Sequence, residues 1–314
     1  MRVFIEYTHL AMKNIRFALI AVIVAVIGLL VVPCITSAGN QINEPLGNVT
    51  NTFSSHNPYI DQQQDLSHTP LSETDTVNSE VLVAVLDTGI DVNHKDLSGK
   101  VVESINFTRS HTIEDKVGHG THIAGIIASE KNGILIKGAS SNIKLLNVKV
   151  AEDDGLVWAS DVAEGIIRAT DKGAQVINMS LVLPSKYQPI EEAIKYAWDR
   201  GVVMTAAAGN FVKCNTYPAA YSNVLAVGAI NFDGKLWEGS NDSDFVNAYA
   251  PGVSILSTIP GNKYGYQSGT SMASAYVSAV GARAINQIVD TNNNNKSSDE
   301  IMDLLISLFP KTDR

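Results

Sequence analysis

The segment Val81-Leu82-Val83-Ala84-Val85-Leu86-Asp87-Thr88-Gly89 is an unbroken apolar run that ends in an acid and a glycine. Continuous runs of this kind predict a strand that is buried on both faces of a parallel sheet. Binding sites in open α/β sheets form at the carboxyl ends of the strands, and Asp87 stands at such an end. Taken alone, its carboxylate could equally cap the following turn.

Apolar segments of strand and helix type alternate along the rest of the chain. Strands are predicted at residues 143–150, 174–181 and 202–208, with helices at 159–172 and 190–200 between them. This alternation predicts an α/β fold with a mostly parallel β-sheet and helices on both faces.

A separate apolar run, residues 17–32, lies near the N-terminus behind Lys13 and Arg16. With the small residues Thr36-Ser37-Ala38 after it, the run predicts a secretory signal over residues 1–38 that is cleaved after Ala38. The run is short for a membrane span of about 20 residues, which favours cleavage over an uncleaved anchor. The sequence therefore predicts a secreted protein, with a membrane-anchored, outward-facing protein as the alternative.

The remaining chain divides into a polar extension, residues 39–79, and one large domain, residues 80–314. Cleavage would remove three basic residues and one acidic residue, which changes the formal net charge from −9 to about −11. This acidity argues against nucleic acid or an anionic membrane surface as partner, and we expect a monomer. Cleavage would also remove Cys34 and leave Cys214 as the one cysteine, so no internal disulfide is expected.

Three further stretches carry residues suited to chemistry. His119, flanked by glycines in Gly118-His119-Gly120-Thr121-His122, is suited to act as a general base near neutral pH. The spacing of His119 and His122 is a weak zinc pattern, because zinc helices usually place their ligands four residues apart with a Glu between them. His122 is expected to pack as a structural histidine.

Ser271 lies in Ser268-Gly269-Thr270-Ser271-Met272-Ala273-Ser274, which predicts a loop that enters a tightly packed helix. It could cap that helix or act as a nucleophile beside backbone N–H groups. Asn210, at the end of a predicted strand, is either a turn residue or an amide donor to an oxyanion. Asp87, His119, Asn210 and Ser271 together supply the orienting acid, base, oxyanion donor and nucleophile of acyl transfer.

Asp87-Thr88-Gly89, His119-Gly120-Thr121-His122 and Gly269-Thr270-Ser271-Met272-Ala273 resemble the three signature blocks of subtilisin-like serine proteases. The order Asp, His, Ser is also that of the family, whereas an α/β-hydrolase would need Ser before the acid and a glycine at position 273. The resemblance extends from about residue 81 to the C-terminus. It implies a subtilisin-like three-layer fold, a serine endopeptidase with a polypeptide substrate, Asn210 as oxyanion donor and no cofactor for catalysis.

The same resemblance implies the positions of a substrate site and a metal site. Two strands, Gly155-Leu156-Val157 and Ser180-Leu181-Val182, should flank an extended substrate, and Phe211 should favour apolar over basic side chains before the scissile bond. Val157 and Val182 stand where glycine is common. Asp96 and Asn132 are the implied ligands of a structural calcium.

Residues 39–79 are too few for the inhibitory folding prodomain that secreted members of this family usually carry. Two other functions stay open on the sequence. One is a membrane-anchored protease that processes a single partner peptide. The other is a non-catalytic relative that binds peptides in a groove altered by Val157 and Val182.

Overall fold

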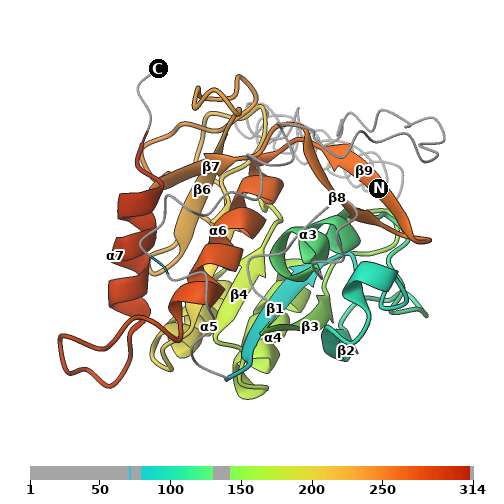
Figure 1. Cartoon of the computed structure of the whole chain (residues 1–314), viewed down its shortest axis with the longest axis horizontal. Coiled ribbons are helices and arrows are strands. Elements are labelled where there is room, and N and C mark those ends of the chain that lie inside the picture. The colour runs from blue at the N-terminus through green and yellow to red at the C-terminus, as the bar shows by residue number, and fades with distance from the viewer. Residues whose placement is uncertain (1–70, 72–78, 130–141, 312–314) are drawn as a thin grey trace, which may run out of the picture. The chain divides into compact units, whose positions relative to one another are not determined.

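The computed structural model describes Leu71, residues 79–129 and residues 142–311, which all belong to the compact unit Ile42–Arg314 (Figure 1). Seven strands form one parallel sheet in the order β2-β3-β1-β4-β5-β6-β7. Their bounds are β1 Val81–Asp87, β2 Val101–Asn106, β3 Ile143–Lys149, β4 Val176–Met179, β5 Val203–Ala207, β6 Leu225–Ile230 and β7 Ala248–Pro251. A separate antiparallel hairpin consists of β8 Ile255–Ile259 and β9 Lys263–Gln267.

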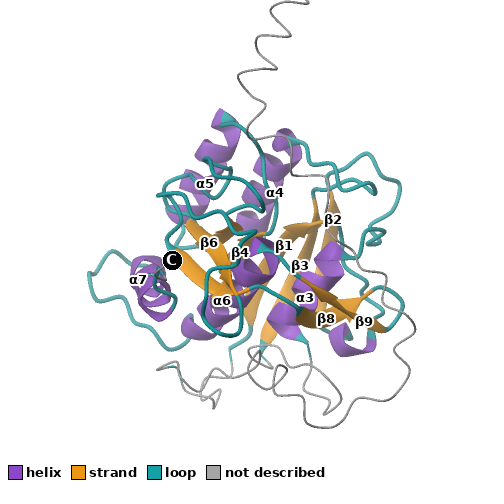
Figure 2. Ribbon diagram, turned by 90° about the horizontal axis from the view of Figure 1, so that it is seen from above, coloured by secondary structure: helices purple, strands orange, loops and turns teal. Residues whose placement is uncertain are grey.

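Helices cover both faces of the sheet. The helices α3 (His119–Ala128), α6 (Thr270–Ala284) and α7 (Ser298–Leu308) lie on one side, and α4 (Ala159–Asp171) and α5 (Gln188–Trp198) lie on the other (Figure 2). This three-layer α/β arrangement confirms the predicted fold class.

The apolar run of β1 is continuous because each face of the sheet has its own core. Val83 and Val85 pack into the cluster under α3 and α6, whereas Ala84 and Leu86 pack into the cluster under α4 and α5. All four side chains are fully buried. Since successive strand residues point to opposite faces, a strand covered on both sides requires an apolar residue at every position.

The predicted strands and helices are present, with small shifts at their ends, but three short strands had no clear pattern. The edge strand β2 contains Glu103 and has no fully buried residue. The strands β7 and β9 are only four and five residues long, and each contains tyrosine. The strands β2 and β9 bury few side chains, and β7 is too short for a recognisable apolar run.

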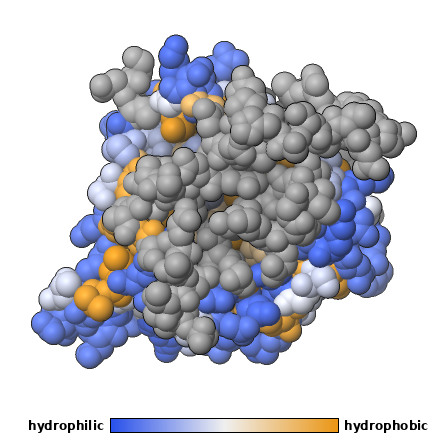
Figure 3. Space-filling view, in the orientation of Figure 1, coloured by the Kyte–Doolittle hydropathy of each residue, from blue (hydrophilic) through white to orange (hydrophobic). Residues whose placement is uncertain are grey.

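The predicted signal, nearly all of the polar extension and Asn132 lie outside the described residues. No helix in the described part of the chain is long and apolar enough to cross a membrane. Cys214 is disulfide-bonded in the full sequence; the expectation of no internal disulfide concerns the chain after loss of Cys34, so it stays a prediction. The described residues visible on the face in Figure 3 are mostly hydrophilic, with small separate apolar areas.

Candidate active site

Asp87 and His119 form a buried pair at the carboxyl end of β1. The Nδ1 atom of His119 lies 2.8 Å from Oδ1 of Asp87, which also accepts the backbone N–H of Thr88 at 2.7 Å. The side chains are almost enclosed, with Asp87 3% and His119 7% exposed. An Nδ1–H that donates to the carboxylate leaves the lone pair of Nε2 free, and Nε2 is buried with no hydrogen-bond partner among the described residues.

The surroundings of His119 set its basicity. Burial by itself would lower the pKa of His119, but the negative charge and the hydrogen bond of Asp87 outweigh it and raise the pKa above 6.5. The charge of Asp115 adds to this increase. The imidazole is therefore a stronger proton acceptor than a free histidine.

Asp115 is a site residue that the sequence reasoning missed. Its carboxylate accepts hydrogen bonds from Thr88 Oγ1 at 2.8 Å, from Gly118 N at 2.7 Å and from Thr121 N at 2.8 Å. It thereby ties the segment after Asp87 to the first turn of α3, where His119 lies. An acid just before a helix start is favourable at the positive end of the helix, which is the signal that could have identified it.

Ser271 is the second residue of α6 and does not cap that helix. Gly269 occupies the cap position, so the capping interpretation of Ser271 is wrong. The Oγ atom of Ser271 donates to the carbonyl oxygen of Ser180 at 3.3 Å and makes no hydrogen bond with Nε2 of His119. The helices that carry the two residues, α3 and α6, pack against each other. Hydrogen bonds between a nucleophile and its base often form only in the complex with substrate.

Asn210 follows β5 and is held beside Ser271 through the neighbouring residue Thr270. Its Oδ1 accepts the backbone N–H and the Oγ1 hydroxyl of Thr270, each at 3.0 Å. Both contacts use the carbonyl end of the amide, so Nδ2 is the end available as a donor. A donor at this position, next to the N-terminus of α6, suits a negatively charged oxygen that develops near Ser271.

The two segments expected to flank a substrate were predicted as strands, and this is wrong, because both lie in loops beside the sheet. Residues 155–157 belong to a turn, closed by an antiparallel bridge between Ala151 and Val157 and by a 2.8 Å hydrogen bond from Glu152 N to Leu156 O. Residues 180–182 continue the chain from β4. Leu156 is 52% and Val182 is 37% exposed, so apolar side chains face solvent in both segments.

Phe211 stands directly after Asn210 and is 49% exposed. Its ring contacts that of Trp237 edge-on at 5.3 Å between centroids, and its backbone N–H donates to Gly239 O at 2.6 Å. Trp237 was not singled out from the sequence, because no local pattern links it to a residue in another loop.

Metal binding gains no support from the described residues, which contain no group of three or more His, Cys, Asp or Glu arranged to hold an ion. Asp96 is buried, and Tyr264 donates its hydroxyl to Oδ2 of Asp96 at 2.5 Å. The second expected calcium ligand, Asn132, is not among the described residues, so the calcium site stays a prediction.

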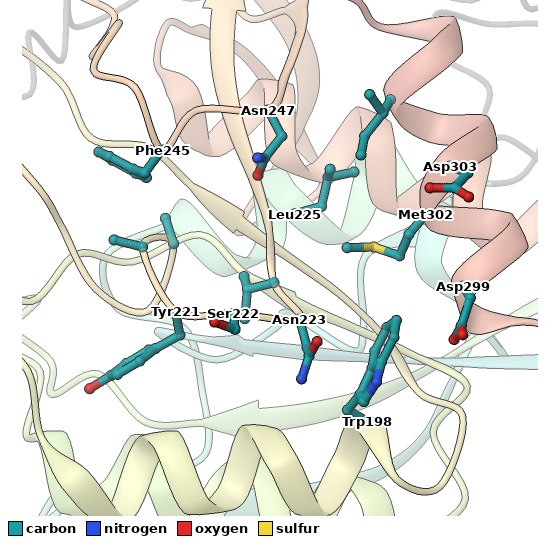
Figure 4. A pocket seen from close by; sticks show the side chains of 14 residues that line it. Trp198, Tyr221, Ser222, Asn223, Leu225, Phe245, Asn247, Asp299, Met302 and Asp303 are labelled. Carbon is teal, nitrogen blue, oxygen red and sulfur yellow. The ribbon is translucent and has the colours of Figure 1, made fainter.

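A pocket of about 510 Å³ lies elsewhere, between α5, β6 and α7 (Figure 4). Trp198, Leu225, Met302 and Asp303 are among its lining residues. None of the predicted site residues lines it.

The sequence is similar to that of known proteases. The family model of the Subtilase family matches residues 78–307. The chain is 44% identical over 208 residues to "Thermophilic serine proteinase" from Bacillus sp. (strain AK1), a match that covers 65% of this chain and 52% of that protein. It is 39% identical over 212 residues to "Major intracellular serine protease" from Bacillus subtilis (strain 168), covering 64% of this chain and 66% of the relative. It is 37% identical over 225 residues to "Subtilisin DY" from Bacillus licheniformis, covering 68% and 81%. The chain thus spans only about half of the first of these relatives.

Proposed function

We propose that this chain, which belongs to the subtilase family, is a serine endopeptidase that hydrolyses peptide bonds through an acyl-enzyme. The observation that carries the proposal is the buried Asp87–His119 pair with an unpartnered Nε2. Two of the relatives named above are serine proteases by their names, and the family match over residues 78–307 includes Asp87, His119, Asn210 and Ser271.

The chemistry follows from these four side chains. Ser271 Oγ attacks the scissile carbonyl carbon while its proton passes to Nε2 of His119, and Asp87 stabilises the resulting imidazolium. The carbonyl oxygen becomes an oxyanion that accepts a hydrogen bond from Nδ2 of Asn210. His119 then gives its proton to the leaving amine. Water then attacks the acyl carbonyl carbon while one of its protons passes to Nε2 of His119. His119 returns this proton to Oγ of Ser271 as the acyl group leaves as a carboxylic acid.

The nucleophile has to turn before it reacts. Its hydroxyl donates to Ser180 O in the structure, and attack requires that it donates to His119 Nε2 instead. Because Ser180 belongs to a segment that we expect to pair with substrate, a substrate N–H would compete for the same carbonyl oxygen. Substrate binding would then favour the reactive orientation of Ser271.

We further propose that the enzyme is exported and that its substrates are polypeptides. Export rests on the N-terminal sequence, residues 1–38, since one relative is named as intracellular. An N-terminus at Gly39 in protein recovered outside the cell would support this, and a cell-bound protein that retains residues 17–32 would favour the anchored alternative.

Labelling with a fluorophosphonate tests the enzymatic proposal. We expect wild-type protein to gain one phosphonyl group by intact mass and to cleave casein, and Ser271→Ala to do neither while it keeps the same circular dichroism spectrum. Ser160→Ala, at an exposed serine, is the matched control and should label like wild type. A folded wild type that neither labels nor cleaves would contradict the proposal.

A further inference from the structure

The helix that carries the nucleophile has a polar face in its buried part. Ser271, Ser274 and Ser278 are spaced three and four residues apart on α6 and therefore lie on one side of it. All three side chains are buried, with Ser274 and Ser278 fully enclosed. Buried hydroxyls need hydrogen-bond partners, so this face must meet polar groups of the sheet.

Asn178 of β4 is the centre of these contacts. Its Oδ1 accepts hydrogen bonds from Ser274 Oγ and from Ser278 Oγ, each at 3.1 Å. Thr205 of β5 completes the group, because its hydroxyl lies 3.2 Å from Ser274 Oγ and 2.5 Å from Ser278 Oγ. Asn178 and Thr205 are fully buried. The acceptor end of the amide thus faces α6, which fixes the direction of its donor end.

The donor end of Asn178 points to the segment after β4. Its Nδ2 donates to Ser180 Oγ at 3.0 Å, and that hydroxyl donates in turn to the carbonyl oxygen of Ser271 at 2.9 Å. The hydroxyl of Ser180 is therefore used as both acceptor and donor. A continuous chain of hydrogen bonds connects Asn178, Ser180 and Ser271.

We propose that Asn178 is a positioning residue for the reaction, because it fixes the position of Ser180 relative to the first turn of α6, which carries Ser271. The proposal rests on the proposed function. Ser180 makes two hydrogen bonds with Ser271: its hydroxyl donates to the carbonyl oxygen of Ser271, and its carbonyl oxygen accepts from the hydroxyl of Ser271. A shift of Ser180 therefore moves the segment expected to bind substrate relative to the attacking oxygen. Displacements of about 1 Å at such a site reduce turnover by up to about 10²-fold.

The test is a double-mutant cycle of Asn178→Ala and Ser180→Ala, with kcat, KM and Tm measured for each variant. If Asn178 acts through Ser180, each single variant loses about tenfold or more in kcat. The double variant then has a lower Tm than Ser180→Ala but the same kcat. Thr205→Val is the matched control, since it removes a hydroxyl of the same buried group with little change in shape. Thr205 Oγ1 lies 3.5 Å from Asn178 Oδ1, but Ser274 and Ser278 still donate to that oxygen in the variant and keep the amide in place. Thr205→Val should therefore lower Tm and leave kcat at the wild-type value.

Each other outcome counts against the proposal. A purely structural role would be shown if Asn178→Ala lowered kcat by the same factor in wild type and in Ser180→Ala. It would also be shown if Thr205→Val lost kcat in proportion to its loss of Tm. If Asn178→Ala does not fold, Ser180→Ala decides alone, because wild-type kcat in that variant removes the proposed connection. A folded wild type that neither labels with fluorophosphonate nor cleaves casein overturns the proposed function, and the role of Asn178 with it.

Discussion

The Nδ1 atom of His119 lies 2.8 Å from Oδ1 of Asp87 in a region that excludes solvent from both side chains. Burial and charge act on the imidazole in opposite directions here. Burial favours the neutral ring, the carboxylate favours the charged ring, and the net result is a raised pKa. The pH dependence of the proposed peptidase activity should report both influences.

We expect the acid limb of the kcat/KM profile to have its midpoint above pH 6.5, because catalysis needs neutral His119. In Asp87→Asn, kcat should fall by about 10⁴-fold, and the limb should move to lower pH. The shift follows because burial, which lowers the pKa of His119, is no longer opposed by Asp87. Stopped-time assays across pH 5 to 9 measure both effects. Asp233→Asn, at an exposed acid, should keep the wild-type kcat and the wild-type midpoint of the acid limb. If the acid limb of Asp87→Asn stays at the wild-type pH, it reports the protonation of a group other than His119.

His122 should make the protein sensitive to acid. Its Nε2 lies 3.0 Å from both Ile255 O and Gly265 O, so it joins α3 to the β8–β9 hairpin as a neutral donor. Burial lowers the pKa of His122 to about 3, whereas the unfolded chain binds a proton below about pH 6.5. Between these values the unfolded state binds more protons, and stability is lost as the pH falls.

The variant His122→Gln keeps an N–H donor but cannot be protonated. Between pH 6.5 and pH 4, its free energy of unfolding should therefore depend less on pH than that of wild type, by about 1.4 kcal/mol per pH unit. Urea titrations in the Ser271→Ala background avoid self-digestion. His111→Gln, at an exposed histidine, should keep the wild-type slope. Identical slopes in all three proteins would mean that His122 does not stay neutral on folding.

Two helical glycines should respond in opposite ways to alanine. At Gly125 in α3, a Cβ would lie 2.3 Å from both Ser257 Oγ and Thr258 Oγ1, and these hydroxyls donate to carbonyl oxygens of α3. Gly125→Ala must therefore push α3 away from β8 or break two hydrogen bonds, at a cost of about 1–3 kcal/mol.

Gly281 in α6 is the matched case, because its nearest neighbour is the methyl tip of Leu305 at 3.3 Å. Gly281→Ala should be neutral or stabilising by up to about 1 kcal/mol, since alanine favours the helix. Urea unfolding of both variants, again in the Ser271→Ala background, compares the two sites. A Gly125→Ala protein as stable as Gly281→Ala would contradict the close approach of α3 to the hairpin.

The sequence could predict what local pattern determines, and little that depends on distant partners. The apolar run before Asp87 predicted a buried central strand, and the stretch around Ser271 predicted a loop that enters a tightly packed helix; both are present. Asn178, by contrast, is one amide in an apolar strand, and its partners Ser274 and Ser278 are about 100 residues away. The contact between Phe211 and Trp237 joins two loops that share no periodicity. Such residues become recognisable only when the fold brings their partners together.

Phe211 provides a test of substrate preference. It is half exposed beside Asn210 and supported by Trp237, so the surface next to the proposed oxyanion donor is apolar and carries no charge at this position. We expect wild type to prefer Leu over Lys before the scissile bond in reporter peptides. Phe211→Glu should raise the Lys-to-Leu ratio of kcat/KM by about tenfold or more, because the carboxylate attracts a basic side chain.

Phe211→Gln separates charge from size, since glutamine has the length of glutamate without its charge. The ratio of kcat/KM should rise much less in Phe211→Gln than in Phe211→Glu. The effect of glutamate should also shrink as salt is increased from 0.05 to about 0.5 M, because an exposed charge is screened. If the two variants change the ratio equally, Phe211 does not face the side chain before the scissile bond, and the preference must arise from another wall of the substrate site, such as Val182.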